Sequence, residues 1–345
     1  MRHPTRMGKQ CVSAALALVA LAMAPAAAQA ADPVTNTDDN GTGSLRNALA
    51  TATSGDTIAV PAGTYQLTSG ELQIATSVTI DGAGASNTVI SRAAGAQSFR
   101  IFHVTGQALG PVVISDLTVR GGNAVYASGG GILNEGAGLL TVAGSTVTAN
   151  NAGANDNIAN HGGGGIASSG AGGLTVLASV ISENTVDEFS GTSSGGGGIY
   201  VRGAPLSIQK GTVVSGNSVT GELATTGGGG GIYGSGGSVS ITDSRIAGNG
   251  LDVTSPGGGA GGGGIYARNL DVTSSTIADN TASVTASVGG NGGGGIYADV
   301  GLDVLASTSA ETAQASSGLS GKAAEGSITP GASRASRTRR SAETR

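Results

Sequence analysis

The first third of the chain alternates short apolar runs with turn residues. Each run has three to eight residues and is rich in Val, Ile, Thr, Tyr or Phe, which is typical of strands. The runs are Thr57–Val60, Gly63–Tyr65, Leu72–Ile74, Val78–Ile80, Thr88–Ile90, Phe99–Val104 and Val112–Val119. Ser44–Thr53 departs from this pattern, because its apolar residues recur at helical spacing and Ser44 can cap the N-terminus. We therefore predict one short amphipathic helix followed by strands.

From Gly129 onward the pattern repeats. Glycine runs end in an isoleucine at steps of 34, 33, 33, 33 and 31 residues, at Ile132, Ile166, Ile199, Ile232, Ile265 and Ile296. Two more short apolar runs follow each of these anchor isoleucines, and then an asparagine, at Asn150, Asn184, Asn217, Asn249 and Asn280. A loop rich in Gly, Ser, Thr and Asn, long enough to project, closes each unit. A fixed period of this length is the signature of a solenoid.

Three short strands per unit, with no helix between them, predict an all-β fold, a right-handed parallel β-helix. Each strand would pair with its equivalent in the next coil, and alternation would point Ile, Val and Leu inward. One coil cannot bury its apolar face alone, so stacking explains the repetition. We expect the Ser44–Thr53 helix to cover the open first edge as an N-terminal cap.

The N-terminus is predicted to be a signal peptide. Basic residues between Arg2 and Lys9 precede an apolar run, Val12–Met23, and Ala28-Gln29-Ala30 supplies a cleavage pattern. A membrane anchor is the alternative, but the run is shorter than the ~20 residues that span a bilayer. We therefore predict a secreted or cell-surface protein with no transmembrane segment in its mature chain. Because Cys11 is the single cysteine, the mature chain would hold neither disulfides nor Cys-ligated metals.

Composition argues against a large globular core, and charge argues against a nucleic-acid partner. The chain has 64 glycines in 345 residues, no tryptophan and 3% aromatic residues, so bulky side chains do not fill a large globular core. Residues 31–304 carry 19 acidic and 8 basic residues, whereas residues 305–345 carry 3 acidic and 6 basic ones. The acidic body argues against a nucleic-acid partner, since phosphates attract Lys and Arg clusters.

Two stretches resemble known families. Asn40–Leu49, with Gly55–Ile58 and Pro61–Tyr65 after it, resembles the N-terminal C-S-L-R-E-A-I segment of bacterial surface and secreted β-helix proteins, with Gly43 and Asn47 in place of its Cys and Glu. The Gly-Gly-Gly-Ile and Ile/Val-x-x-Asn repeats are similar to repeats of polymorphic outer-membrane proteins. Together these resemblances cover about residues 33–304 and imply a pectate-lyase-like right-handed β-helix. They imply no activity, because this fold hosts adhesins, lyases, hydrolases and inert stalks.

The tail, residues 305–345, breaks the repeat. Where Val-Ser-Gly-Asn is expected the chain has Ser309-Ala310-Glu311-Thr312, and the same four residues return 32 positions later. Back-translated and shifted by one base, these residues read Val-Ser-Gly-Asn, and Lys322–Ile328 reads Gly-Gly-Gly-Gly-Ile-Tyr. We therefore predict a frameshifted, poorly ordered tail that leaves the last coil near Ile296 uncapped. An ordinary disordered basic tail is the alternative.

Two sets of repeated residues are candidate sites. Four tyrosines follow anchor isoleucines, so alternation should point them outward in one line: Tyr200, Tyr233, Tyr266 and Tyr297. A stabilising aromatic stack is favoured over a glycan-binding strip. The five asparagines are interpreted as a structural ladder, in which side-chain amides satisfy turn backbone and one another, rather than as a metal or ligand site.

No catalytic or metal site is assigned. Asp81, Asp116 and Arg120, at the ends of early strands, are the best group for a lyase or hydrolase, but Asp is ordinary at turns. His103 and His161 lack partners at ligand spacing and are interpreted as incidental. The glycine runs contain no phosphate-binding or calcium-binding motif, and are interpreted as tight turns and close coil contacts.

These features divide the chain into a signal peptide (1–30), a cap with the first coils (31–125), repeat coils (126–304) and the tail (305–345). We predict an exported non-enzymatic β-helix protein, an adhesin-like or structural surface module that meets a glycan or another cell-surface partner. A polysaccharide lyase or glycoside hydrolase is the alternative, and a non-functional truncated gene product is a further one. No cofactor is expected.

Overall fold

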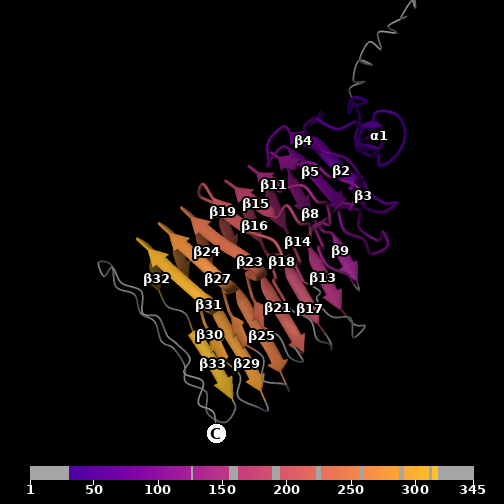
Figure 1. The fold of residues 1–345 in the computed structure, drawn as a ribbon. Helices are drawn as coiled ribbons and strands as arrows, with labels where there is room; N and C mark the ends of the chain where they lie inside the picture. Colours follow the sequence, from indigo (N-terminus) through magenta and orange to yellow (C-terminus); the bar gives the residue numbers. More distant parts are fainter. Residues whose placement is uncertain are drawn as a thin grey trace, which may run out of the picture.

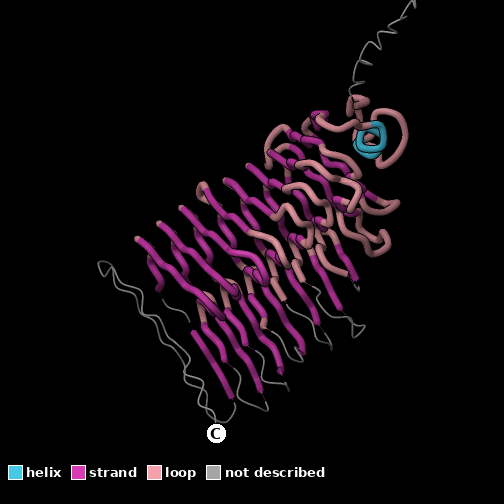
Figure 2. Tube along the Cα trace, in the orientation of Figure 1, coloured by secondary structure: helices cyan, strands magenta, loops and turns pink. Residues whose placement is uncertain are grey.

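The computed structural model describes residues 31–125, 127–154, 162–188, 195–222, 227–255, 260–286, 291–310 and 313–317. In these ranges one helix, α1 (Leu45–Thr51), is followed by strands β1 to β33, which assemble into four sheets. Figure 1 shows the strands stacked along one axis, with α1 at the N-terminal end. Figure 2 shows that loops are more frequent in the coils next to α1 and that strands dominate the later coils.

Sheet 1 contains two strands from each early coil. The first column is β1 (Asp56–Val60), β4 (Val78–Gly82), β7 (Val112–Ser115), β11 (Leu140–Ala143), β15 (Leu174–Leu177) and β19 (Leu206–Gln209). The second column is β3 (Leu72–Ile74), β6 (Phe102–Val104), β10 (Ile132–Asn134), β14 (Ile166–Ser168) and β18 (Ile199–Arg202), of which the last three begin at anchor isoleucines. In later coils the two columns join into single long strands, β23 (Ile232–Thr242), β27 (Ile265–Thr273) and β31 (Ile296–Leu305).

Sheet 2 follows sheet 1 around the first corner of each coil. Its strands are β2 (Gly63–Leu67), β5 (Thr88–Arg92), β8 (Thr118–Arg120), β12 (Thr146–Thr148), β16 (Val180–Ser182), β20 (Val213–Ser215), β24 (Arg245–Ala247), β28 (Thr276–Ala278) and β32 (Thr308–Ala310). At the corner between β7 and β8, Asp116 adopts a φ of 53°. This left-handed residue turns the chain, so the predicted single run Val112–Val119 is divided into two strands.

Sheets 3 and 4 occupy segments that the sequence predicts as loops. Sheet 3 contains β9 (Asn123–Val125), β13 (Asn151–Ala154), β17 (Thr185–Glu188), β21 (Ser218–Glu222), β25 (Gly250–Ser255), β29 (Thr281–Ala286) and β33 (Ala313–Ser317). Sheet 4 contains β22 (Gly228–Gly229), β26 (Ala260–Gly262) and β30 (Asn291–Gly293). Sheet 3 buries its own apolar cluster, which includes Val186, Val219 and Leu251. The prediction that these segments are loops is therefore wrong for these residues, because stacked segments pair their backbones.

One continuous apolar core runs along the axis. The anchor isoleucines lie in register from Ile132 through Ile166, Ile199, Ile232 and Ile265 to Ile296. All of them except the last, Ile296, are fully buried. Coil stacking thus supplies the burial that a single coil lacks.

The five repeated asparagines form a hydrogen-bonded ladder at the corner between sheets 2 and 3. The side-chain amides of the first four each donate to the Oδ1 of the asparagine in the next coil, over 2.9 to 3.0 Å. The Oδ1 atoms of the last four each also accept from the backbone N–H of the preceding asparagine, as Asn217 Oδ1 does from Asn184 N at 3.0 Å, and Asn150 Oδ1 accepts from the Gly122 N–H. All five are buried at 0–1% exposure, so the ladder satisfies polar groups that water cannot reach.

The N-terminal helix covers the first coil. Ser44 caps it by accepting a hydrogen bond from the Asn47 N–H at 3.1 Å, while Leu45, Ala48 and Leu49 are buried. Its buried face contacts β3 and β1. The predicted all-β parallel β-helix with a short capping helix is confirmed. Within the described ranges no helix has the length and apolar character needed to cross a bilayer.

The C-terminal end differs from the sequence prediction. The prediction left the coil that begins at Ile296 incomplete, but β31 extends to Leu305, and β32 and β33 pair in register with the preceding coil and continue it. Backbone pairing does not depend on side-chain type, which is why an altered sequence can still extend the ladder. Ser309 occupies the position where Ile277 lies in the coil before it. The frameshift stays a prediction, and residues 318–345 of the predicted tail lie outside the described residues.

Candidate functional site

One outward row on sheet 1 carries most of the candidate chemistry. Register pairing places its residues side by side in successive coils, in the order Gln73, His103, Leu133, Ala167, Tyr200, Tyr233, Tyr266 and Tyr297. The row therefore changes from polar at the capped end to aromatic in the later coils. Charged side chains gather beside His103, and the tyrosines stack.

The four tyrosines form one continuous stack. Neighbouring ring centroids are 5.2, 4.8 and 5.3 Å apart, and neighbouring rings lie within 10° of parallel. Tyr200 and Tyr233 are only 3% and 6% exposed, whereas Tyr266 and Tyr297 are half-buried. Burial, together with the neighbouring Tyr233, raises the pKa of Tyr266 to about 12. The rings point away from the isoleucine core, as predicted, but two of them are not accessible.

This stacking bears on the glycan-binding hypothesis for the tyrosines. A sugar ring stacks on an aromatic face, and here the faces of Tyr233 and Tyr266 lie against other tyrosines on both sides. The geometry supports a stabilising stack of near-parallel rings, and aromatic pairs of this kind are worth about 0.5–1.5 kcal/mol each beyond burial. A ligand-binding role for the four tyrosines stays a prediction.

A charged cluster surrounds His103. Its Nδ1 lies 2.8 Å from Glu71 Oε1 and its Nε2 lies 2.8 Å from Glu135 Oε2. Arg100 Nη1 donates to the other oxygen of Glu71 at 3.0 Å. The His103 and Arg100 side chains are 17% and 13% exposed. The interpretation of His103 as incidental is therefore wrong, because two carboxylates hold its ring. His161 lies outside the described residues.

The cluster shifts the titration of both Glu71 and His103. Hydrogen bonding to Glu71 raises the pKa of His103, against the lowering effect of burial, and Glu135 adds to the rise. Burial alone would raise the pKa of Glu71, but the His103 hydrogen bond and the Arg100 charge outweigh it and lower that pKa. The arrangement thus favours a charged imidazolium between two carboxylates.

The sequence contained a signal for this cluster. Glu71 and Glu135 each lie 32 residues from His103, two positions beyond its in-register neighbours Gln73 and Leu133, which each lie 30 residues from it. In a solenoid, residues about one repeat apart in the sequence lie side by side in neighbouring coils. A search at one coil's spacing that also covers the diagonal neighbours, two residues out of register, would have found the three residues.

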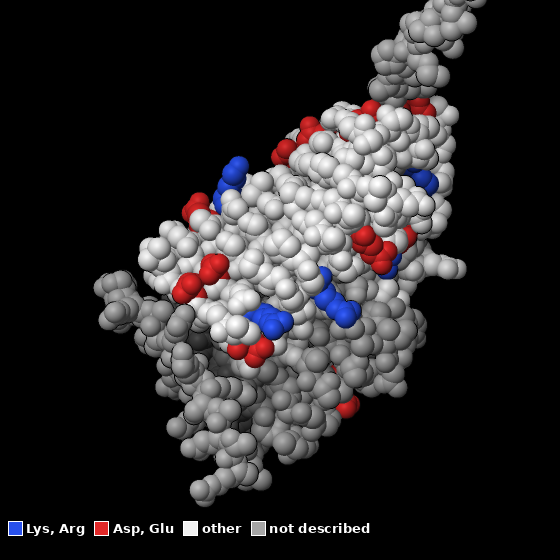
Figure 3. Space-filling view, in the orientation of Figure 1, with Lys and Arg blue, Asp and Glu red and all other residues white. Residues whose placement is uncertain are grey.

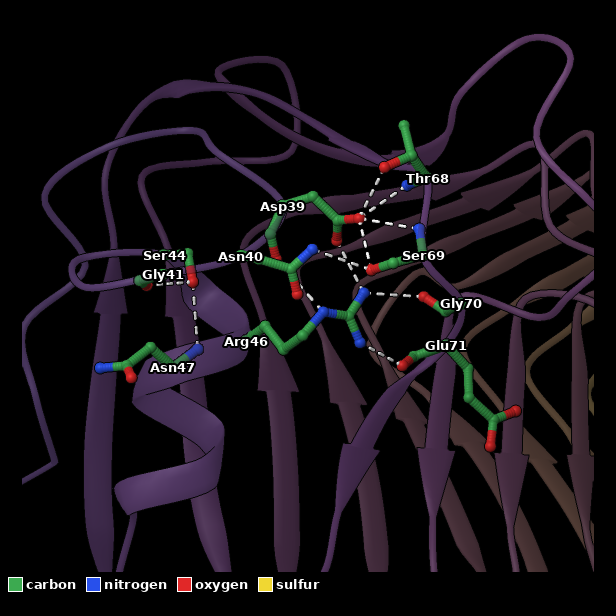
Figure 4. Close-up of polar contacts among 10 residues, drawn as sticks. All are labelled: Asp39, Asn40, Gly41, Ser44, Arg46, Asn47, Thr68, Ser69, Gly70 and Glu71. Atoms are coloured by element: carbon green, nitrogen blue, oxygen red, sulfur yellow. Dashed lines mark hydrogen bonds and ion pairs between the residues drawn. The ribbon is translucent and has the colours of Figure 1, made fainter.

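A second polar cluster fastens the capping helix to the first coil (Figure 4). Asp39 Oδ2 accepts hydrogen bonds from the backbone N–H and hydroxyl groups of Thr68 and Ser69, at 2.7 to 2.9 Å. Arg46 in α1 donates to Asp39 Oδ1 at 2.7 Å and to the carbonyl oxygens of Gly70 and Glu71 at 2.8 and 2.6 Å. Burial would raise the pKa of Asp39, but the bonds from Arg46, Ser69 and Thr68 outweigh it and lower that pKa.

The Arg46 contacts explain the Ser-Leu-Arg segment of α1 as a structural device. Arg46→Met should lower the free energy of unfolding by about 2 kcal/mol, because it removes donors from a part-buried carboxylate and two backbone carbonyls. The free energy of unfolding of Arg46→Lys should lie between those of the wild type and Arg46→Met, since lysine keeps the positive charge but not the planar guanidinium group. Chemical denaturation measures both. Exposed Arg120→Met is the control and should change stability by less than about 0.5 kcal/mol; an equal loss in Arg120→Met would contradict the role of Arg46.

A shallow pocket lies between α1 and β3, beside both clusters. Its volume is about 450 Å³, and its lining includes Leu49 and Leu72 on the apolar side and Arg46, Glu71 and Gln73 on the polar side. The Glu71 carboxylate already accepts bonds from His103 and Arg100, so the pocket's charged group is engaged with the protein itself.

The group Asp81, Asp116 and Arg120 is not assembled into a site. Asp81 and Asp116 lie near each other at the corner between sheets 1 and 2, where Asp81 pairs with Ser115. Asp81 Oδ1 accepts a hydrogen bond from the Ser115 hydroxyl at 2.7 Å. Arg120 ends β8 at the opposite corner, and among the described residues no ion pair joins it to either aspartate. The strand between the corners separates the proposed cation from the carboxylates.

Charges on the visible face are sparse. Figure 3 shows small separate groups of acidic and basic side chains on it and no continuous basic surface. In the part of the chain that the structure describes, no group of three or more His, Cys, Asp or Glu side chains is arranged to hold a metal ion. With both imidazole nitrogens of His103 engaged by carboxylates, that ring has no free lone pair to offer a metal.

The fold and the site define a parallel β-helix with a capped N-terminal end, an aromatic stack and one paired charged cluster. No protein-family model and no curated protein matches the sequence.

Among solved structures, the chain is similar to the A-module of mannuronan C-5 epimerase AlgE6 from Azotobacter vinelandii, with 17% identity over 84% of this chain and 94% of that one, and a TM-score of 0.38. The AlgE4 A-module from the same organism has 15% identity over 78% and 91%, with a TM-score of 0.34. ORF18 of Geobacillus virus E2 has 14% identity over 83% and 60%, with a TM-score of 0.31. At these TM-scores the likeness carries no argument about what this chain does.

Proposed function

We propose that this chain is an exported non-enzymatic β-helix module, which serves as a rigid adhesin-like or structural element at the cell surface. The observation that carries the proposal is the use made of the repeated residues. The asparagines and tyrosines that recur from coil to coil bind or stack on their equivalents in the next coil. Residues selected for coil-to-coil contact build a rod, whereas a catalytic site needs groups that occur once and remain free for substrate.

The projecting strands of sheet 3 are the surface that we propose for a partner. They repeat in seven strands with their own apolar support and extend away from the main core in Figure 1. Short polar side chains such as Thr220 and Thr254 are exposed along these strands. Such a surface offers exposed hydroxyl groups on β21, β25 and β29, which suits a glycan or another cell-surface partner. Export through residues 1–30 would deliver the module to that location.

A polysaccharide lyase or hydrolase is the second candidate, and the Glu71, His103 and Glu135 cluster is the observation that favours it. Carboxylates, an imidazole and Arg100 lie together beside a pocket, and these are the groups of acid–base catalysis. Against it, an imidazolium that donates to two carboxylates has no lone pair for a substrate proton, and Glu71 is engaged on both oxygens. The paired state of the cluster supports the non-enzymatic proposal.

Turnover on a panel of acidic and neutral polysaccharides separates the two candidates. We expect the mature chain to release neither reducing ends nor unsaturated products from these polysaccharides. We also expect protease added to intact producing cells to degrade the protein, because it lies at the cell surface. Product release that Glu71→Gln abolishes, and that the exposed Glu183→Gln retains, would overturn the proposal in favour of an enzyme. Full protection from externally added protease, with no protein in the medium, would overturn the surface location.

A further inference from the structure

Residue 71 joins two clusters that otherwise lie apart. Its backbone carbonyl accepts a 2.6 Å hydrogen bond from Arg46 of the capping helix. Its carboxylate is held by His103 of the second coil and by Arg100. Figure 4 shows the carbonyl facing Arg46 and the carboxylate pointing away from it. Glu71 therefore connects the capping helix to the charged cluster around His103 through hydrogen bonds.

The protonation state of His103 decides how many bonds the cluster can make. Both ring nitrogens lie 2.8 Å from a carboxylate oxygen. A neutral imidazole has one N–H and one lone pair, so it can donate to Glu71 or to Glu135 but not to both. The remaining lone pair would face a negatively charged oxygen at hydrogen-bond distance. Both contacts are favourable only when the ring is an imidazolium.

We propose that His103 is a pH-sensitive lock, which when protonated ties the capping helix and first coil to the third coil through Glu71 and Glu135. Deprotonation breaks one of the two bonds and leaves a repulsive contact in its place. The contacts between α1, β3 and β10 then loosen, although the backbone ladders persist. The lock is a property of the capped end alone, because the later positions of this row are leucine, alanine and tyrosine.

All the charged groups that face His103 belong to three coils. Glu71 precedes β3, Arg100 precedes β6 and Glu135 follows β10, while the in-register neighbours Gln73 and Leu133 are uncharged. The Arg100 charge disfavours protonation of His103, but it also holds Glu71 in place. The two carboxylates outweigh it and burial together, so the pKa of His103 lies above its ordinary 6.5.

The pH window of the lock follows from these directions. Because the His103 pKa is raised in the folded chain, its contribution is complete below about 6.5 and is lost as the pH rises through the raised value. Because the Glu71 pKa is lowered, its contribution is present above its ordinary 4.5 and is lost as the pH falls through the lowered value. The lock is therefore closed in mildly acidic solution and opens on the alkaline side.

Hydrogen exchange of the full mature chain between pH 5.5 and 8.5, corrected for intrinsic rates, tests the lock. Protection of amides in α1 and β3 should fall on the order of tenfold across the His103 transition, whereas amides in β20 and β24 should show no such step. His103→Gln should remove the step. An NMR titration, with His103 assigned by its loss in that variant, should give a pKa above 6.5.

Glu135→Gln provides a second, milder variant that leaves the imidazole in place. It should lower the His103 pKa and move the exchange step to lower pH, while the exposed Glu183→Gln should leave both unchanged. The proposal is overturned if His103 titrates at or below 6.5. It is equally overturned if amide protection in α1 has the same pH dependence in the wild type and in both cluster variants.

Discussion

Replacing Asn217 with alanine is expected to lower the free energy of unfolding by about 3–5 kcal/mol. Its side-chain amide donates to the carbonyls of Ile181 and Ser215 and to Asn249 Oδ1, and its own Oδ1 accepts two bonds from Asn184. Asn217 is fully buried, so no water replaces these partners. Each buried polar group left unpaired costs about 1–3 kcal/mol, and the substitution leaves several.

The exposed Asn269, on β27, is the matched control. Asn269→Ala removes the same atoms from a solvent-facing position and should change stability by less than about 0.5 kcal/mol. Denaturant unfolding followed by circular dichroism measures both variants. Equal losses for Asn217→Ala and Asn269→Ala would show that the asparagine ladder does not stabilise the coils in the way that its geometry indicates.

A methyl group at Gly197 is expected to be at least as damaging. A Cβ built at this position would lie 2.6 and 2.7 Å from the backbone oxygen and nitrogen of Ser218, and closer still to the carbonyl oxygen of Gly230. All three atoms are backbone, so no side chain can rotate away. Gly197→Ala must therefore push the backbone away both from Ser218 in the same coil and from Gly230 in the next, at a cost of about 3 kcal/mol or more.

Gly106→Ala is the control for that substitution. The nearest atom to a Cβ there is the Glu135 carbonyl oxygen, at an ordinary 3.9 Å, and the residue is exposed. Its effect should stay within about 0.5 kcal/mol of zero. The midpoints of thermal unfolding compare the pair, and a Gly197→Ala chain as stable as Gly106→Ala would contradict the close backbone packing of the glycine runs.

Local pattern was sufficient to predict much of this fold. Ser44, with apolar residues at helical spacing after it, predicted α1 because capping and amphipathicity act within one turn. The 31–34 residue period predicted the parallel stacking, since equal lengths bring equivalent residues into register. The recurring asparagines predicted a ladder for the same reason. The period and the asparagines repeat along the chain, so each coil carries that information again.

Contacts between residues far apart in the sequence were not predictable in the same way. His103 looked incidental because its partners, Glu71 and Glu135, are 32 residues away on either side. The sequence also contains no second histidine with glutamates at this spacing, so the pattern does not stand out as a repeat. The projecting segments looked like loops because their glycines and serines have low strand propensity, yet stacking pairs their backbones. The sequence suggested that Asp81 and Arg120 lie together because both are at the ends of early strands. The structure separates them, because the chain turns a corner at Asp116 before the strand that ends in Arg120.

The sequence by itself determined the repeat, the capping helix, the inward-facing isoleucines and the asparagine ladder, because each depends on spacing along the chain. Only the tertiary structure decided that Tyr200 and Tyr233 are covered, and that Glu71 connects the cap to His103. It also decided that sheet 3 forms at all. Burial and ion pairing depend on which atoms from different coils meet across a corner. That outcome is set by the packing of several coils together and by no single coil's sequence.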